Sequence, residues 1–225
     1  MRVAFLSDVH ANLVALQAVL VELDRQGIER VFHAGDIVGY YPFPNETIQE
    51  FRRRGIVTIL GNHDRAALNA NAMGMNPMAS IAARWTARHL DPDSITYLRA
   101  LRPSLDVRIG AVRSSIFHGS PRDDDEYIYE MEAEEGLLEM CGSRLLVLGH
   151  THVPYVVTTS RGTIINPGSV GQPRDGDPRS CFIIYDSTKG VFEHQRITYD
   201  IKLVEAAVYR AGLPEELSDR LWQGV

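Results

Sequence analysis

The sequence IVTIL at residues 56–60 runs directly into GNHD at residues 61–64. The first part is a short apolar run rich in β-branched residues, which is typical of a buried core strand. The second part places three polar side chains, Asn62, His63 and Asp64, directly after a glycine. Because ligands of α/β sheets bind beyond the carboxyl ends of the strands, we expect a buried strand here that delivers these side chains to a functional site.

The same arrangement recurs at other apolar runs of the chain. Residues 3–7 lead into Asp8 and His10, residues 31–34 into Asp36, and residues 145–148 into His150 and His152. A weaker run at residues 115–117 leads into His118. These runs therefore predict strands that end in Asp, Asn or His.

The first half of the chain predicts alternating strands and helices. Apolar spacing predicts a helix over residues 12–26, which joins the first two strands as a parallel βαβ unit. A second helix ending near residue 54 follows. Residues 65–102 predict a helical insertion that either covers a sheet face or shapes one wall of a pocket.

The second half predicts mainly strands, with one helix near residues 131–140. The strands are expected at residues 105–109, 111–118, 145–148, 155–159, 163–166, 181–186 and 191–198. Two short C-terminal helices within residues 200–222 are expected to pack on the core or against another subunit of a homo-oligomer. With no internal repeat or linker, residues 1–225 are expected to form a single α/β domain of two packed sheets with helices outside.

Composition narrows the class of protein. The 225 residues are 44% hydrophobic and 23% charged, with a net charge of -6 that argues against binding long double-stranded nucleic acid. Cys141 and Cys181 are too few for a disulfide framework, which fits a reducing compartment. No signal peptide or membrane span is visible, so we expect a cytoplasmic protein without membrane contact.

The histidines point to metal. Five of the eight lie in the strand-end segments, although any one of them alone fits a satisfied core or surface histidine better than a ligand. Gathering so many ionisable groups at buried strand ends is costly unless cations pair with them. In an extended segment residues i and i+2 point the same way, so Asp8 with His10, and His150 with His152, are each expected to present two ligands from one face. The donor types favour a pair of Mn, Fe, Zn, Co or Ni ions over Ca.

This ordered set resembles the calcineurin-like metallophosphoesterase superfamily. The matching motifs are Asp8-x-His10, Gly35-Asp36, Gly61-Asn62-His63-Asp64, His118 and Gly149-His150-x-His152. The loop at residues 166–174, NPGSVGQPR, is similar to that of the small bacterial and archaeal phosphodiesterase branch. The resemblance implies a four-layer α/β/β/α sandwich of two mixed β-sheets flanked by helices.

The resemblance also implies roles for single residues. Asp36 bridges two divalent ions, with Mn or Fe favoured. One ion is held by Asp8, His10, Asp36 and His152, and the other by Asp36, Asn62, His118 and His150. A bridging hydroxide attacks the phosphate in line, and His63 is no ligand but faces the phosphate and acts as an acid.

Some positions depart from the family pattern. Phosphoprotein phosphatases carry Asp and Arg three and four residues after the bridging Asp, where this chain has Gly39 and Tyr40. That activity is therefore disfavoured. Asp64 either orients His63, as a catalytic residue, or makes a purely structural hydrogen bond. Ala11 stands where many relatives carry glycine.

Other residues are candidates for substrate binding. Asn12 either donates to a phosphate oxygen or caps the following helix. Arg65 and Arg174 are expected to grip the non-reacting part of a substrate. Tyr40 and Tyr41 either stack on a base or pack in the core. Residues 123–135 hold eight acidic side chains, which form a solvated face or flank the pocket and repel long polyanions.

The resulting hypothesis is a dimetal phosphodiesterase that acts on a small phosphoester or nucleotide. Three alternatives remain: a nuclease on short single-stranded nucleic acid, a non-catalytic scaffold of the same fold, and a phosphoprotein phosphatase. The presence of His63 with a full set of candidate ligands argues against a pure scaffold.

Overall fold

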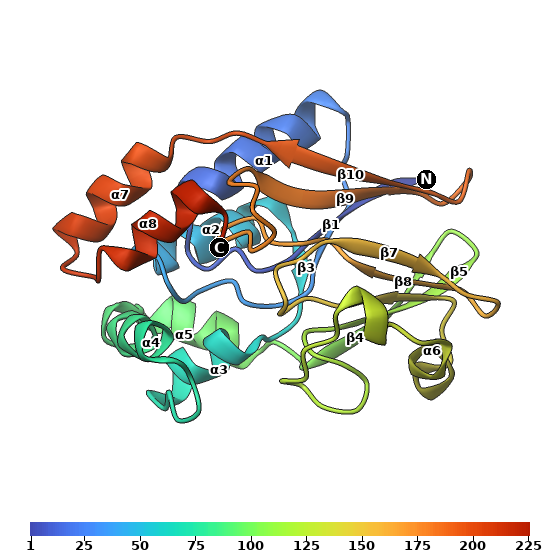
Figure 1. The fold of residues 1–225 in the computed structure, drawn as a ribbon, viewed down its shortest axis with the longest axis horizontal. Helices are drawn as coiled ribbons and strands as arrows, with labels where there is room; N and C mark the ends of the chain where they lie inside the picture. The colour runs from blue at the N-terminus through green and yellow to red at the C-terminus, as the bar shows by residue number, and fades with distance from the viewer.

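A computed structural model describes residues 1–225 and contains two five-stranded sheets (Figure 1). The first sheet has the strand order β10-β9-β1-β2-β3. Its strands are β1 (Arg2–Leu6), β2 (Val31–His33), β3 (Val57–Thr58), β9 (Ser180–Asp186) and β10 (Val191–Ile197). β1 and β2 pair in parallel around α1 (Leu13–Arg25), which confirms the predicted βαβ unit.

The second sheet has the strand order β4-β5-β6-β8-β7. Its strands are β4 (Ser104–Ile109), β5 (Val112–Phe117), β6 (Leu145–Val147), β7 (Tyr155–Thr158) and β8 (Thr163–Asn166). β6 pairs in parallel with both β5 and β8, whereas the two outer pairs are antiparallel. Both sheets are therefore mixed, as predicted.

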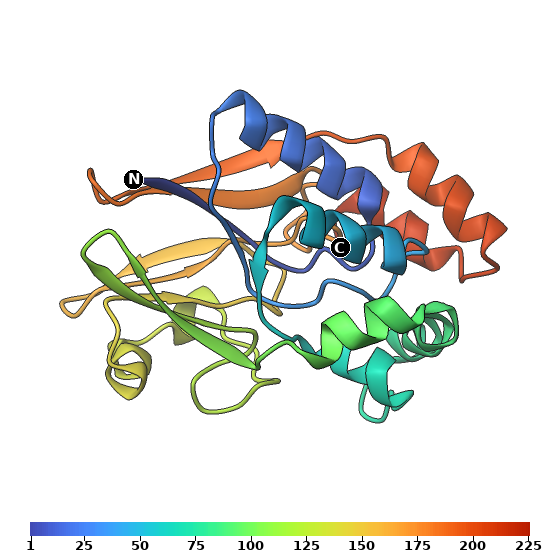
Figure 2. The same cartoon turned by 180° about the vertical axis from the view of Figure 1, so that it is seen from behind.

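Alternating residues of β1 divide the core between the two faces of the first sheet. Phe5 belongs to the apolar cluster between the sheets, together with Val147 of β6. Ala4 and Leu6 belong to the cluster that contains Leu16 of α1. Figure 2 shows α1 and α2 (Pro44–Arg54) crossing this outer face of the first sheet.

The second sheet is covered by α6 (Glu135–Cys141), which follows the short 3-10 turn η1 (Glu130–Glu132). Leu137 and Leu138 of α6 pack on Leu146 and Ile164 of the sheet. The layers are therefore helix, sheet, sheet and helix, which confirms the predicted fold class.

The remaining helices gather at one end of the sheets (Figure 1). They are α3 (Asn62–Asn69), α4 (Pro77–His89), α5 (Pro92–Arg99), α7 (Ile201–Arg210) and α8 (Glu216–Gln223). Val204 and Leu217 of the last two helices pack in one cluster with Ala82 of α4. No helix of the chain is both long and apolar enough to cross a membrane.

The expected buried strand at residues 56–60 is wrong in two respects. β3 contains only two residues and lies at the edge of its sheet, where Val57 is 42% exposed. Asn62 and His63 do not end a strand but form the first turn of α3. The run is apolar because Ile56 and Ile59 reach the two core clusters on either side of this short strand.

Candidate metal centre

The candidate ligands converge where β1 and β2 of one sheet end beside β5 and β6 of the other. Six of the seven are at most 5% exposed: Asp8, His10, Asp36, His118, His150 and His152. Their donor atoms form groups within 4.8 Å of one another. Asp8, His10 and His152 make one group, Asp36, His118 and His150 make a second, and a third joins His10 and Asp36 to His63. Asp36 is therefore placed between two potential cation positions.

The backbone brings these residues together by a route that we did not expect. Asp8 and His10 have φ values of 53°, and His150 and His152 have values of 67° and 62°. These are left-handed conformations, so the predicted extended geometry, with i and i+2 on one face, is wrong. Non-glycine residues rarely adopt such angles, and they persist where the surrounding fold imposes them, often at functional sites.

The first group has its nitrogen lone pairs aimed inward. Nδ1 of His10 lies 3.3 Å from the Val38 carbonyl oxygen, and Nδ1 of His152 lies 2.6 Å from that of Gln172. Because a carbonyl oxygen only accepts, each Nδ1 carries the proton and each Nε2 keeps its lone pair. The two Nε2 atoms nevertheless lie 3.1 Å apart, and Oδ1 of Asp8 lies 3.3 Å from Nε2 of His152. Such an approach of electron-rich atoms suits a shared cation.

The second group is oriented in the same way. Nδ1 of His118 donates to the Ala34 carbonyl at 2.8 Å, so its Nε2 faces Oδ2 of Asp36 at 3.3 Å and Oδ1 of Asn62 at 2.9 Å. Nε2 of His150 donates a hydrogen bond to the Asp125 carbonyl at 3.1 Å. Its Nδ1 therefore keeps the lone pair that could bind a metal ion. Outer hydrogen bonds of this kind commonly orient histidine ligands.

Burial and mutual charge set the protonation of the cluster. Burial lowers the pKa of His150 to about 3 and holds the pKa of His10 well below its usual value. Burial opposes ionisation of Asp36, yet His118 and its neighbours hold the pKa of that carboxyl low. Burial also disfavours charge on His118, but Asp36 outweighs it and raises the pKa of His118 to about 10. A proton on His118 thus supplies the positive charge that a cation would supply.

The donor set fits divalent cations by a further observation. Oδ1 of Asp8 and Oδ2 of Asp36 are buried atoms without a hydrogen-bond partner. A buried, ionised oxygen without a partner is costly, whereas coordination to a cation satisfies it. Carboxylate oxygen with imidazole nitrogen, and no thiolate, is chemistry for Mn, Fe, Co, Ni or Zn.

His63 lies beside this cluster without a hydrogen-bonded orienting group. Its ring contacts those of His10 and Tyr40, with centroids 4.7 and 4.5 Å away, and its buried Nδ1 has no hydrogen-bond partner. Burial lowers its pKa to about 4. Gly39 makes this packing possible, because a Cβ there would lie 2.6 Å from Nδ1 of His63.

Asp64 makes no hydrogen bond to His63, and the hydrogen bonds that it does make are those of the structural alternative. Its carboxylate accepts hydrogen bonds from the backbone N–H groups of Asp36, Ile37, Val38 and Gly61, at 3.0 to 3.3 Å. As the third residue of α3, Asp64 turns back towards the loop after β2. It therefore fixes the loop that carries Asp36.

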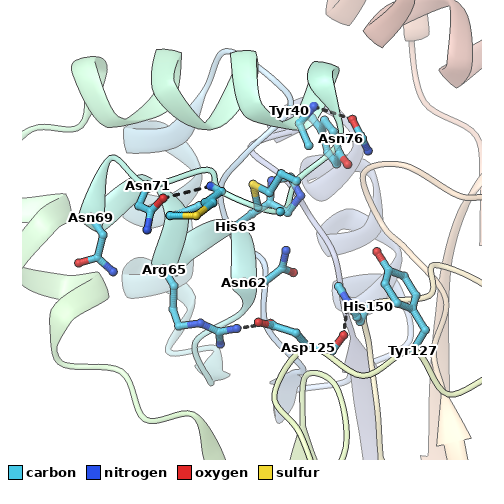
Figure 3. A pocket seen from close by; sticks show the side chains of 15 residues that line it. Tyr40, Asn62, His63, Arg65, Asn69, Asn71, Asn76, Asp125, Tyr127 and His150 are labelled. Atoms are coloured by element: carbon cyan, nitrogen blue, oxygen red, sulfur yellow. Dashed lines mark hydrogen bonds and ion pairs between the residues drawn. The ribbon is translucent and has the colours of Figure 1, made fainter.

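A cavity of about 600 Å³ opens beside the cluster (Figure 3). Asn62, His63 and His150 form its inner end. Asn71 and residues 73–76, between α3 and α4, line one side, and Asp125 and Tyr127 line the other. Both the helical insertion and the acidic segment therefore contribute walls to one pocket.

The family model for the calcineurin-like phosphoesterase superfamily domain matches residues 1–190. The chain belongs to this superfamily. The buried groups of Asp and His at the ends of the sheets are therefore consistent with membership of a phosphoesterase superfamily.

Individual proteins are similar to this chain over its whole length. An uncharacterized protein of Methanocaldococcus jannaschii is 31% identical over 240 residues, covering 99% of this chain and 98% of that protein. A metallophosphoesterase from Sphaerobacter thermophilus has a TM-score of 0.87 and 36% identity, covering 100% of this chain and 99% of that one. A hypothetical protein from Pyrococcus horikoshii has a TM-score of 0.92 at 24% identity, covering 100% and 98%, and this likeness concerns the fold.

The residues proposed for substrate binding lie in different environments in this phosphoesterase. Asn12 is fully buried, accepts from Ala15 N at 3.1 Å and donates to the Gly171 carbonyl at 2.9 Å, which are the contacts of the helix-capping alternative. Arg65 lines the cavity. Arg174 lies nearby and donates to the Tyr40 hydroxyl at 3.1 Å.

The aromatic residues near the site differ from those expected from the sequence. Tyr41 is fully buried and packs in the core, whereas Tyr40 is 2% exposed and lines the cavity beside His63. The sequence reasoning missed Tyr127, whose ring stacks on His150 with centroids 3.9 Å apart. No spacing pattern marks it, since it lies within a segment whose composition indicates only a solvated face.

Proposed function

We propose that this phosphoesterase is a metal-dependent phosphodiesterase that hydrolyses a small phosphodiester or nucleotide at a dinuclear centre. The observation that carries the proposal is the pair of buried groups of candidate ligand atoms linked through Asp36, in which one carboxylate oxygen each of Asp8 and Asp36 has no hydrogen-bond partner. Two ions, with Mn or Fe favoured, would be held by Asp8, His10, Asp36 and His152 on one side and by Asp36, Asn62, His118 and His150 on the other. Two bound cations would neutralise phosphoryl oxygens and lower the pKa of a bound water.

The residues around the donors have separate tasks. Asp64 holds the Asp36 loop through backbone hydrogen bonds, and the Asp125 carbonyl holds the ring of His150. His63 has an unpaired buried nitrogen and lies within reach of His10 and Asp36, from where it would supply a proton to the leaving oxygen. This role requires His63 to take up a proton, which a bound phosphate anion favours by raising its pKa.

Two features of the sequence support a small diester over a protein phosphate or a long nucleic acid as the substrate. Gly39 and Tyr40 leave no arginine at the place where phosphoprotein phosphatases carry one, and the net charge of the chain is -6. The two cysteines are unpaired, which is consistent with our placing this activity in the cytoplasm. One domain comprising residues 1–225 is part of the same proposal.

The test is hydrolysis of bis(p-nitrophenyl) phosphate by Mn-loaded protein, by chelator-treated protein and by the His63→Asn variant. We expect chelation to abolish activity and Mn to restore it. His63→Asn is expected to lower kcat by about 10²- to 10⁴-fold on a dinucleoside monophosphate, whose alkoxide leaving group needs a proton, and by less on the nitrophenyl ester, whose leaving group departs as a stable anion. His194→Asn is the matched control, since His194 is exposed on β10, far from the donor groups in sequence and structure.

Two outcomes would contradict the proposal. Equal activity of His63→Asn and His194→Asn on the dinucleoside monophosphate would remove His63 from the mechanism. No hydrolysis by protein that retains bound Mn would instead favour the non-catalytic scaffold.

A further inference from the structure

The cavity contains one permanent cation and one carboxylate among its lining residues, Arg65 and Asp125. Figure 3 shows these two side chains meeting across the cavity, where they form an ion pair. Apart from His63 and His150, the other lining residues are not ionised at neutral pH. Together with Arg174, which lies nearby on Tyr40 but does not line the cavity, the pair sets the charge that an incoming substrate meets beyond the metal centre.

Both partners are held in place by elements of the site. Arg65 lies on α3, two residues after His63. Asp125 is fixed at its backbone, because its N–H donates to Oδ1 of Asp123 at 2.8 Å and its carbonyl accepts from Nε2 of His150 at 3.1 Å. Tyr127, two residues further on, stacks on the same His150 ring. The carboxylate of Asp125 therefore stays at the cavity wall.

Arg65 has hydrogen-bonding capacity that Asp125 does not use. Its Nη2 pairs with Asp125, but its Nη1 is buried and has no partner. A guanidinium group has five N–H donors and binds carboxylate or phosphate with a two-pronged geometry. Arg65 can therefore bind an anionic group, but Asp125 already cancels its charge.

We propose that Asp125 is a specificity-determining residue. By pairing with Arg65, it makes the cavity select substrates whose non-reacting part is uncharged over substrates that carry a second anionic group there. This inference rests on the proposed phosphodiesterase function. A second phosphate entering the cavity competes with Asp125 for Arg65 and is repelled by the same carboxylate.

The size of the effect follows from the exposure of the pair. The side chains of Arg65 and Asp125 are 26% and 60% exposed, and pairs of this kind are weak. Selection is therefore graded. Removing the Asp125 charge is expected to change substrate preference by about three- to tenfold, since it frees Arg65 and also removes a repulsion.

The experiment compares two substrates that share a leaving group and differ by one phosphate. They are thymidine 5′-(p-nitrophenyl phosphate) and the same ester with an added 3′-phosphate. We expect Asp125→Asn to raise the ratio of kcat/KM, 3′-phosphorylated over unphosphorylated, by about three- to tenfold. Adding Arg65→Gln in the double variant is expected to cancel this gain.

Asp124→Asn provides the matched control. Asp124 is exposed, lies next to Asp125 in the same segment and has no side-chain hydrogen bond. Its substitution removes the same charge, so an equal gain in this variant would mean that general surface charge, rather than the pair with Arg65, sets the preference. A gain in substrate preference also cannot result from partial unfolding.

A binding measurement tests the pair without metal or turnover. Inorganic phosphate is expected to raise the Tm of chelator-treated Asp125→Asn protein more than that of wild type, and the double variant should lose this difference. If wild type cleaves the unphosphorylated ester and Asp125→Asn leaves the ratio unchanged, the role of Asp125 is wrong while the proposed function stands. If Mn-loaded wild type cleaves neither ester, the proposed function fails, and equal phosphate responses would overturn the Asp125 proposal separately.

Discussion

At the scale of single residues, His33 shows what burial does to a histidine outside the candidate ligand set. It is fully buried, its Nδ1 lies 2.9 Å from the Thr58 hydroxyl, and its Nε2 has no partner. Burial lowers the pKa of His33 to about 3. Because an unfolded histidine has a pKa near 6.5, the unfolded chain binds this proton first as the pH falls.

The sign of the resulting pH dependence follows directly. The contribution of His33 to stability is complete above about pH 6.5 and decreases as the pH falls towards 3. We expect His33→Gln to remove a slope of about 1.4 kcal/mol per pH unit between pH 6.5 and pH 4. Urea unfolding of chelator-treated wild type and variant measures it, since the other histidines titrate in both. Parallel curves for the two proteins would contradict the assignment.

At the scale of local elements, the loop after β1 contains three left-handed residues, Asp8, His10 and Ala11. Ala11 has a φ of 58° and donates its backbone N–H to the Ile37 carbonyl at 2.7 Å. A left-handed conformation costs a residue with a Cβ about 1–2 kcal/mol, and glycine avoids this cost. Glycine also makes the unfolded chain more flexible, which offsets part of the gain in stability. We expect Ala11→Gly to increase the free energy of unfolding by about 0.5–1 kcal/mol, as measured by urea denaturation.

Gly39→Ala is the opposite case and serves as its control. Gly39 has a φ of 120°, and an added Cβ would lie 2.6 Å from Nδ1 of His63. This variant should be less stable than wild type and should lose the proposed phosphodiesterase activity through displacement of His63. If Ala11→Gly were also destabilising, strain would not be the property that distinguishes these loops.

The elements themselves were largely predictable. The helix at α1 and the strands β8 and β9 lie within a residue or so of the predicted ranges, because apolar spacing follows directly from which face is buried. β3 was misjudged, since an apolar run does not reveal whether a second strand covers its far edge. The side chains that meet at the cluster were found from their positions after strands.

What could not be predicted depends on contacts between distant segments. Asp8 and His150 have left-handed φ angles where the two sheets pack together. The residue types alone do not predict these angles. Asp64 looks like a partner for its neighbour His63, yet its carboxylate is occupied by backbone groups of residues 36–38. Tyr127 reaches His150 only because the loop after β5 folds back over β6.

At the scale of the whole molecule, the cluster joins the two sheets. Asp8 and Asp36 follow β1 and β2 of the first sheet, whereas His118 and His150 follow β5 and β6 of the second. A cation held by both sets of residues therefore links the two layers. Its binding should stabilise the entire fold and not only the loops that carry the donors.

Metal removal tests this link. Each ion present at 100 times its Kd contributes about 2.7 kcal/mol to the free energy of unfolding, so Mn should raise Tm measurably above that of chelator-treated protein. We expect two Mn per chain by metal analysis, a cooperative unfolding transition in both states, and a loss of the second ion in the His118→Ala variant. Ca is the control cation, because it prefers all-oxygen sites and should stabilise the protein less. Retention of a single ion at saturating Mn, or a Tm indifferent to chelation, would mean that the donor groups do not act as one centre across the sheets.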